Sequence, residues 1–294
     1  MSLSDTSLFA ESWNVAFRLK KQGSIFEDLD SRFMIIPNSL RYWAADPMVF
    51  TYKNNTYVFA ELYDYVRCRG ILGYTKYDGK QFGKWKPIII EEWHLSYPLI
   101  FEYNDNIYII PESGFNKSLN LYKAIEFPDK WERVKTITTG VNWADTTIFE
   151  TEEGFEGYAL LIDDDIKSQK IKLDKLFNIM SVEDDNIHYK KECSRCGGKI
   201  FIKDNITVRV CQDCVGEYGR GLYFYRYDNN NKIELDPIHL YPEQIKINSN
   251  IKWRGMHTYT ANEIMEVIDL KTRRFNLINF TFRLLNKLKR ILQL

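Results

Sequence analysis

Residues 46–61 read DPMVFTYKNNTYVFAE, two runs of alternating apolar and polar residues on either side of the turn-forming segment KNN. Such alternation, rich in aromatic and β-branched residues, is typical of two antiparallel strands joined as a hairpin. The pattern returns four times, as YPLIFEYNDNIYIIPE (97–112), DTTIFETEEGFEGYALLID (145–163), GGKIFIKDNITVRVCQD (197–213) and RGMHTYTANEIMEVID (254–269). The chain therefore contains an internal repeat of β-hairpins.

The spacing of the hairpins predicts the fold class. Their period is roughly fifty residues, which is the length of one four-stranded propeller blade. The segments RGILGYTKYD, NLYKAIEF and GLYFYRYD supply outer strands for three of the blades. We predict an all-β protein, a five-bladed β-propeller followed by a C-terminal amphipathic helix. The alternative is an irregular β-sandwich in which the repeat arises by chance.

The chain is expected to have two parts. Residues 1–270 form the propeller, and the segment WNVAFRLK (13–20) supplies a strand that the last blade lacks and so closes the ring. Residues 271–294 form the helix, which carries seven basic residues and no acidic one. A basic amphipathic helix of this kind favours an anionic membrane surface, contacted here through residues 273–294. The alternative is that its apolar side docks on the propeller or on a partner chain.

The overall charge limits the classes of partner. Forty basic residues balance forty acidic ones, so no overall electric field attracts nucleic acid, and no nucleic-acid partner is expected. The sequence shows neither a run of eighteen apolar residues nor a secretory signal pattern. We therefore expect a cytoplasmic protein, peripheral on the inner face of the membrane.

Several motifs occur in the order known from one protein family. They are WNVAFRL (13–19), ADP (45–47), HLSYPLIFEYNDNIYIIPES (94–113), LYKAIEFPDKWE (121–132), DTTIFE (145–150), SRCGGKIF (194–201), QDC (212–214) with YGRGL (218–222), and RGMHT (254–258). On these residues the chain resembles the propeller domain at the N-terminus of glucosamine inositolphosphorylceramide transferase and in bacterial polysaccharide-locus proteins. That domain is similar in turn to the five-bladed propellers of arabinanase- and invertase-type glycoside hydrolases. The resemblance implies carbohydrate chemistry without deciding between transfer and hydrolysis.

Acidic residues at the hairpin ends predict the catalytic site. The start of the first strand and the end of the second lie at the same open end of a hairpin, so five such ends form a polar funnel. Glycosyl chemistry needs one carboxylic acid and one carboxylate. Asp46 is the first choice for the base or nucleophile. Glu112, Asp145 and Asp213 are candidates for the acid and for a third carboxylate that tunes the other pKa values.

Further residues at or near these ends are expected to bind substrate: Trp43, Glu61, Tyr97, Arg195, Arg254 and His257. Trp43 would form an apolar wall for a sugar ring. Arg195, Arg254 and His257 are suited to an anionic group such as a phosphate or a sugar carboxylate. The alternative is structural, since a buried Arg or Asp at the mouth of a blade often pairs with its neighbour and holds adjacent blades together.

The segments CSRC (193–196) and CQDC (211–214) predict a zinc site in the fourth blade. Cys193 would face Cys214, and Cys196 would face Cys211, across the open end of one hairpin. Four thiolates at C-x2-C spacing suit a tetrahedral structural Zn²⁺. The alternative is four partly buried free thiols, because cysteine is common in buried strands.

Three functions remain open from the sequence. The first is an enzyme of cell-surface glycan or polysaccharide assembly that carries out glycosyl transfer at the funnel on a carbohydrate or lipid-linked glycan. The second is a glycoside hydrolase of the arabinanase or invertase type. The third is a non-catalytic glycan-binding or scaffolding propeller. We favour an enzyme, because the carboxylates, the arginines and the histidine gather at one end of the predicted ring.

Overall fold

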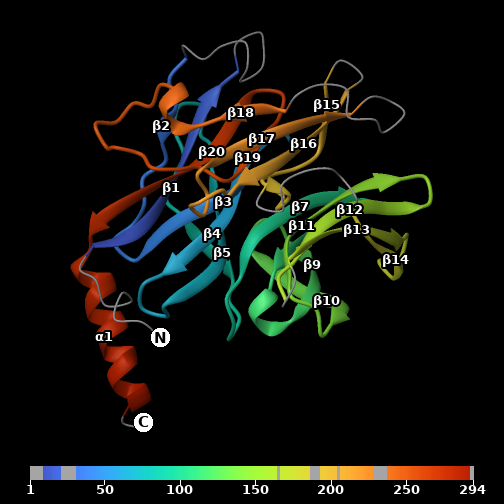
Figure 1. Cartoon of the computed structure of the whole chain (residues 1–294), viewed down its shortest axis with the longest axis horizontal. Helices are drawn as coiled ribbons and strands as arrows, with labels where there is room; N and C mark the ends of the chain where they lie inside the picture. Colours follow the sequence, from blue (N-terminus) through green and yellow to red (C-terminus); the bar gives the residue numbers. More distant parts are fainter. Residues whose placement is uncertain are drawn as a thin grey trace.

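The computed structural model describes residues 9–20, 31–163, 166–185, 193–203, 206–227 and 237–291, with side chains up to residue 288. Its strands form five four-stranded antiparallel sheets, which are the five blades of a β-propeller (Figure 1). This architecture confirms the predicted all-β fold. The single α-helix, α1 (Leu277–Ile291), extends from one side of the propeller.

Each blade contains four strands. Blade 1 contains β3 (Tyr42–Tyr52), β4 (Asn55–Asp64), β5 (Arg69–Lys76) and β6 (Lys86–Ile89). Blade 2 contains β7 (Ser96–Tyr103), β8 (Asn106–Glu112), β9 (Ser118–Glu126) and β10 (Lys130–Thr139). Blade 3 contains β11 (Trp143–Thr151), β12 (Gly154–Leu161), β13 (Lys167–Asp174) and β14 (Ile179–Asp184). Blade 4 contains β15 (Phe201–Lys203), β16 (Ile206–Asp213), β17 (Gly221–Tyr227) and β18 (Ile238–Leu240).

Blade 5 joins the two ends of the chain. It contains β19 (Tyr259–Ala261), β20 (Met265–Phe275), β1 (Phe9–Leu19) and β2 (Met34–Ile35), in that order across the sheet. The N-terminal strand β1 pairs with β20 along its whole length, from Phe9 opposite Phe275 to Leu19 opposite Met265. In this blade β1 is the third strand and β2 is the outermost one, so the two ends of the chain pair in one sheet.

The first strands of blades 1, 2 and 3 share one irregularity near the axis. The register shifts between Ala45 and Met48, between Ser96 and Leu99, and between Ala144 and Thr147. Inside these three β-bulges, Asp46, Tyr97 and Asp145 have φ values of 52°, 44° and 47°. A left-handed conformation is uncommon for non-glycine residues and needs support from the surrounding structure. Bulges often re-aim groups beside functional sites, and these three recur at the same place in successive blades.

Apolar side chains fill the spaces between blades. One cluster joins blades 1 and 2 through Phe59 and Ile100, and another joins blades 2 and 3 through Ile110 and Phe155. The contact of blade 4 with blade 3 also contains a buried charge. The Arg209 guanidinium lies 3.8 Å from the centre of the Tyr158 ring and donates to Asp185 Oδ2 at 2.7 Å.

Helix α1 begins later than the predicted boundary at residue 271. Strand β20 continues to Phe275, because residues 271–275 still pair with residues 9–13 of β1. The Asn276 side chain then caps the helix by accepting the N–H of Asn279 at 2.9 Å. None of the helices that the structure describes is long and apolar enough to cross a membrane.

The helix contacts the propeller with its polar side. Asn279 is buried, Arg283 is half-buried, and the Asn286 amide donates to Cys68 Sγ at 3.1 Å. The apolar side is exposed, with Leu277 at 57%, Leu285 at 46% and Leu288 at 44% of their full accessible surface. The apolar side therefore does not dock on the described part of the propeller.

Candidate functional site

The hairpin ends of the blades surround a cavity of about 440 Å³ at one end of the propeller axis. Six of the predicted site residues line it: Trp43, Asp46, Glu61, Glu112, Arg195 and His257. The other lining residues are Trp13, Tyr63, His94, Ser96, Gly114, Phe115, Asn142, Ile162 and Tyr218. Residues from all five blades or their connecting loops therefore meet at the predicted funnel.

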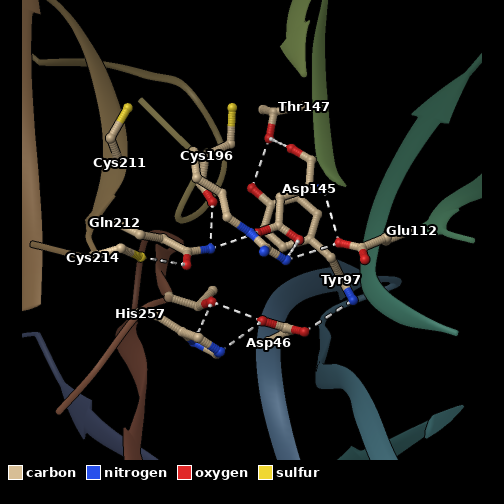
Figure 2. Close-up of polar contacts among 12 residues, drawn as sticks. Asp46, Tyr97, Glu112, Asp145, Thr147, Cys196, Cys211, Gln212, Cys214 and His257 are labelled. Atoms are coloured by element: carbon tan, nitrogen blue, oxygen red, sulfur yellow. Dashed lines mark hydrogen bonds and ion pairs between the residues drawn. The ribbon is translucent and has the colours of Figure 1, made fainter. Parts of the chain in front are cut away.

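Carboxylates from neighbouring strand ends hold the bulges at the base of this cavity. The N–H of Asp46 donates to Asp269 Oδ2 at 3.0 Å. The N–H of Tyr97 donates to Asp46 Oδ2 at 3.1 Å (Figure 2). The N–H of Asp145 donates to Glu112 Oε2 at 3.1 Å. Each left-handed bulge residue thus donates its amide to an acidic side chain of the preceding blade.

Asp46, His257 and Asp269 form one connected group. Asp269 accepts a contact from His257 Nδ1 at 2.6 Å, and His257 Nε2 lies 3.7 Å from Asp46 Oδ1. Burial raises the pKa of Asp46 to about 6, and the His257 charge opposes this rise. Burial alone would lower the pKa of His257, but Asp269 and then Asp46 raise it. The raised pKa favours a charged His257, which pairs with Asp269 and faces Asp46 beyond hydrogen-bond distance.

Asp145 and Glu112 share one arginine but differ in ionisation. Arg195 Nε lies 2.5 Å from Asp145 Oδ2, and Arg195 Nη2 lies 3.1 Å from Glu112 Oε2. Burial opposes ionisation of Asp145, but its contacts with Arg195 lower the pKa overall. For Glu112 burial dominates and raises the pKa well above its ordinary value, despite Arg195. The two carboxyl groups, which Figure 2 shows beside each other, therefore differ: the pKa of Asp145 is lowered and that of Glu112 is raised.

Glu61 is a second carboxyl group whose pKa is raised by burial. Its pKa is raised well above the ordinary value, first by burial and then by Asp46, and its Oε1 atom accepts no hydrogen bond. His94 Nε2 lies 3.3 Å from Oε1, while His94 Nδ1 accepts the N–H of Gly70 at 3.0 Å. Burial lowers the pKa of His94 to about 4, so the imidazole is neutral with its proton on Nε2.

Stacked aromatic rings form apolar walls of the cavity. The Trp13 ring stacks on His257 with centroids 3.9 Å apart, and the Trp43 ring stacks on Tyr63 with centroids 4.9 Å apart. The Arg195 guanidinium lies over Tyr218 at 5.3 Å. Aromatic faces beside carboxyl groups suit the apolar faces and hydroxyl groups of a sugar.

Four predicted site residues do not line the cavity. Asp145 is buried and pairs with Arg195. The Tyr97 side chain is fully buried, and its hydroxyl contacts Thr147 and the backbone of Gly198, so it ties blades together. Arg254 lines a neighbouring cavity. Asp213 accepts the Tyr241 hydroxyl at 3.0 Å and the N–H of Val215 at 2.9 Å, so placing it in the funnel was wrong. Side chains alternate along a strand, and Gln212 is the residue that reaches Asp145.

The four cysteines do not converge as the zinc prediction requires. Cys196 and Cys211 face each other across the hairpin, as expected. The Cys214 thiol, however, contacts Gln212 Oε1 at 3.8 Å, and the Cys193 thiol contacts Asp213 Oδ1 at 3.9 Å. Among described residues, the group whose ligand atoms converge within 4.8 Å is Asp46, His257 and Asp269, and its contacts are those of the ion pairs above. Burial raises the pKa of Cys211 to about 12, which fits the alternative of buried thiols.

Sequence reasoning missed several lining residues. Asp269 occupies the same place in blade 5 as Glu61 does in blade 1 and Glu112 does in blade 2. The repeat could therefore have predicted its position. Trp13, Tyr63, His94 and Tyr218 were not identified, since they come from the N-terminal strand and from segments outside the repeat.

Comparisons with known proteins agree with this architecture. Residues 38–275 match the family described as glucosamine inositolphosphorylceramide transferase 1, N-terminal. The glucosamine inositolphosphorylceramide transferase 1 of Oryza sativa subsp. indica is 30% identical over 234 residues, which cover 73% of this chain and 30% of the rice protein. The corresponding protein of Arabidopsis thaliana is 29% identical over 232 residues, covering 73% of this chain and 29% of its own length. The chain thus spans less than a third of these relatives.

Solved structures share the fold at low sequence identity. A β-1,2-mannobiose phosphorylase from Listeria innocua has a TM-score of 0.55 and 10% identity, covering 80% of this chain and 91% of its own. The catalytic domain of the GH62 α-L-arabinofuranosidase of Coprinopsis cinerea has a TM-score of 0.54 and 9% identity, covering 77% of this chain and 90% of its own. At these identities the likeness concerns the propeller fold alone.

The pKa of Asp46 predicts a pH-dependent effect of Asp46→Asn. Because the folded pKa of about 6 exceeds the ordinary 3.8, the proton stabilises the fold fully below pH 3.8, and this stabilisation is lost as the pH rises through 6. Asparagine cannot ionise but still offers an oxygen to Tyr97 N–H. When the pH is raised from about 4.5 to about 7.5, the free energy of unfolding of Asp46→Asn should increase by about 2 kcal/mol relative to that of the original chain.

Chemical denaturation at both pH values measures this difference. The exposed Asp105→Asn is the matched control and should show no comparable change with pH. An Asp46→Asn effect that is equal at the two pH values would show that Asp46 is ionised throughout.

Zinc binding by the four cysteines stays a prediction that the observed thiol positions do not support. If the hairpin takes up Zn²⁺ by rotating these side chains, protein purified without added metal holds about one zinc per chain, lost together with thermal stability in Cys196→Ser. Cys68→Ser, outside the hairpin, is the control. Elemental analysis and melting curves decide this, and metal-free protein would refute it.

Proposed function

The chain belongs to the glucosamine inositolphosphorylceramide transferase 1 N-terminal family, and from this premise we propose that it is a carbohydrate-active protein of cell-surface glycan assembly. The proposed activity is glycosyl transfer at the propeller funnel. Because the relatives are much longer than this chain, their whole activity is not assigned to it. What supports the proposal is the chemistry of the cavity itself.

One observation carries the proposal: carboxyl groups with different pKa values line one cavity with aromatic walls. Glu112, whose pKa is raised, would give its proton to the leaving oxygen. Asp46, with a pKa of about 6, would act as the base, and His257 would stabilise its ionised form. Asp145 stays ionised and holds Arg195 in position. Carboxyl groups whose environments push their pKa values apart are the mark of acid and base roles.

A non-catalytic glycan-binding propeller is the second candidate, and one observation favours it. Arg195 pairs with both Asp145 and Glu112, while Asp46 and Glu112 each accept the amide of a bulge in the next blade. Contacts of this kind also hold blades together. If holding blades is their whole role, the cavity binds sugars without converting them.

The test screens the full chain against nucleotide-sugar and lipid-linked glycan panels, with Glu112→Gln as the variant. For an acid catalyst, we expect a loss of turnover on the order of a hundredfold or more, with sugar binding retained. The exposed Glu102→Gln is the matched control and should keep full turnover. Binding without turnover in the original chain would support the second candidate. No binding of any glycan would contradict both.

We also propose that helix α1 binds an anionic membrane surface. Its polar side contacts the propeller, which leaves Leu277, Leu285 and Leu288 exposed, and the exposed Lys287 complements anionic lipid headgroups. An enzyme held at the membrane in this way would meet a lipid-linked glycan. This supports the expected peripheral membrane location. The cytoplasmic address stays a prediction from the sequence.

Liposome co-sedimentation tests the membrane proposal. Leu285→Gln combined with Leu288→Gln should abolish binding to phosphatidylserine-containing liposomes without unfolding the propeller, because both side chains are exposed. The control combines Leu176→Gln with Ile202→Gln, which are 73% and 74% exposed on other blades. Equal binding by both double variants, or no binding by the original chain, would show that the helix serves a different contact.

A further inference from the structure

A second cavity, of about 600 Å³, lies beside the funnel and reaches helix α1. Strands β1 and β20 contribute most of its lining, and Arg283 contributes from α1. Trp13 and Trp43 line both cavities. The two cavities therefore adjoin at these two rings.

Positive charge dominates the second cavity. Four basic side chains line it, Arg254, Lys271, Arg273 and Arg283, against the two acidic side chains of Glu11 and Glu217. Glu217 is already engaged, because it accepts Lys271 Nζ at 2.8 Å. No hydrogen bond or ion pair joins the Arg254 side chain to any other residue in the part of the chain that the structure describes. The cavity thus has basic groups in excess of its acidic ones.

Lys271 is the unusual member of this set. Its side chain is 1% exposed, and its ammonium group donates to Glu217 Oε1 and to the backbone oxygen of Tyr218. It also lies 6.0 Å from the centre of the Trp13 ring. An ammonium group has three N–H donors, so one remains for a ligand. The ion pair with Glu217 compensates the burial of this cation.

We propose that this second cavity is a phosphate-binding subsite, which holds a phosphate or diphosphate group attached to the sugar bound in the funnel. The inference rests on the proposed function and names the substrate class for it: a phosphate-linked glycan or activated sugar. Arg254 and Arg273 present planar guanidinium groups, which bind phosphate oxygens in pairs, and Lys271 adds a point charge. Trp13 and Trp43 separate the sugar from its phosphate.

Two sources of the phosphate fit this chemistry. One is a lipid-linked sugar, whose chain would leave the cavity beside α1. The other is a nucleotide sugar, whose nucleoside would occupy the same outer end. The shared group is the phosphate, so the first experiment uses inorganic diphosphate alone.

Isothermal titration of the full chain with inorganic diphosphate tests the subsite independently of any sugar. Combining Arg254→Ala with Arg273→Ala should weaken binding about tenfold or more, since two charge-assisted contacts are lost and both residues are exposed enough to be replaced without unfolding. The control combines Lys80→Ala with Lys84→Ala, which removes two exposed charges from blade 1. Its affinity should stay within about twofold of the original.

Two further measurements distinguish a failure of this inference from a failure of the proposed function. Glu112→Gln in the funnel should leave diphosphate binding within about twofold even where it abolishes glycan turnover, because Glu112 does not line the second cavity. Tighter binding of a short-chain polyprenyl diphosphate than of uridine diphosphate would identify a lipid-linked ligand, and the reverse order a nucleotide sugar. Two results would contradict the phosphate subsite: no diphosphate binding by the full chain, or equally tight binding by the arginine double variant and the lysine double variant. Neither result would bear on the proposed function of the funnel.

Discussion

The hydrogen bond from a left-handed bulge amide to an acidic side chain of the preceding blade is the contact on which this propeller depends. Asp269 accepts the amide of Asp46, Asp46 accepts that of Tyr97, and Glu112 accepts that of Asp145. A buried amide without a partner would destabilise the bulge, and a buried carboxylate without a partner would destabilise the blade. Paired, they fix both the angle between blades and the position of the acids.

The same contact explains why the cavity has reactive groups. Acids that hold the bulges must be buried, and burial raises the pKa of Asp46, Glu61 and Glu112. Arg195 counters this effect most strongly at Asp145, which stays ionised. Structural locking and acid–base chemistry are therefore not separate uses of these residues. One arrangement provides both, and mutation of a single acid will affect stability and ionisation together.

Helix α1 makes one side of the ring different from the others. Its polar side meets blades 1 and 5, and Arg283 projects from it toward the cavity that Trp13 and Trp43 share with the funnel. The exposed apolar side, the basic cavity and the funnel consequently lie on connected parts of the surface. A phosphate-bearing glycan anchored in a membrane would contact all three, which is why the charge of this region matters as much as the acids.

The sequence by itself determined the hairpins, their number and the open ends at which Asp46, Glu61, Glu112 and His257 gather, because period-two alternation and a repeat of roughly fifty residues are local properties. Only the tertiary structure decided which side chains point inward. A bulge turns Tyr97 away from the funnel, strand alternation replaces Asp213 by Gln212, and the paired termini bring Trp13 onto His257. The ionisation of each acid also followed from packing, since desolvation and Arg195 act across blades that are far apart in the chain.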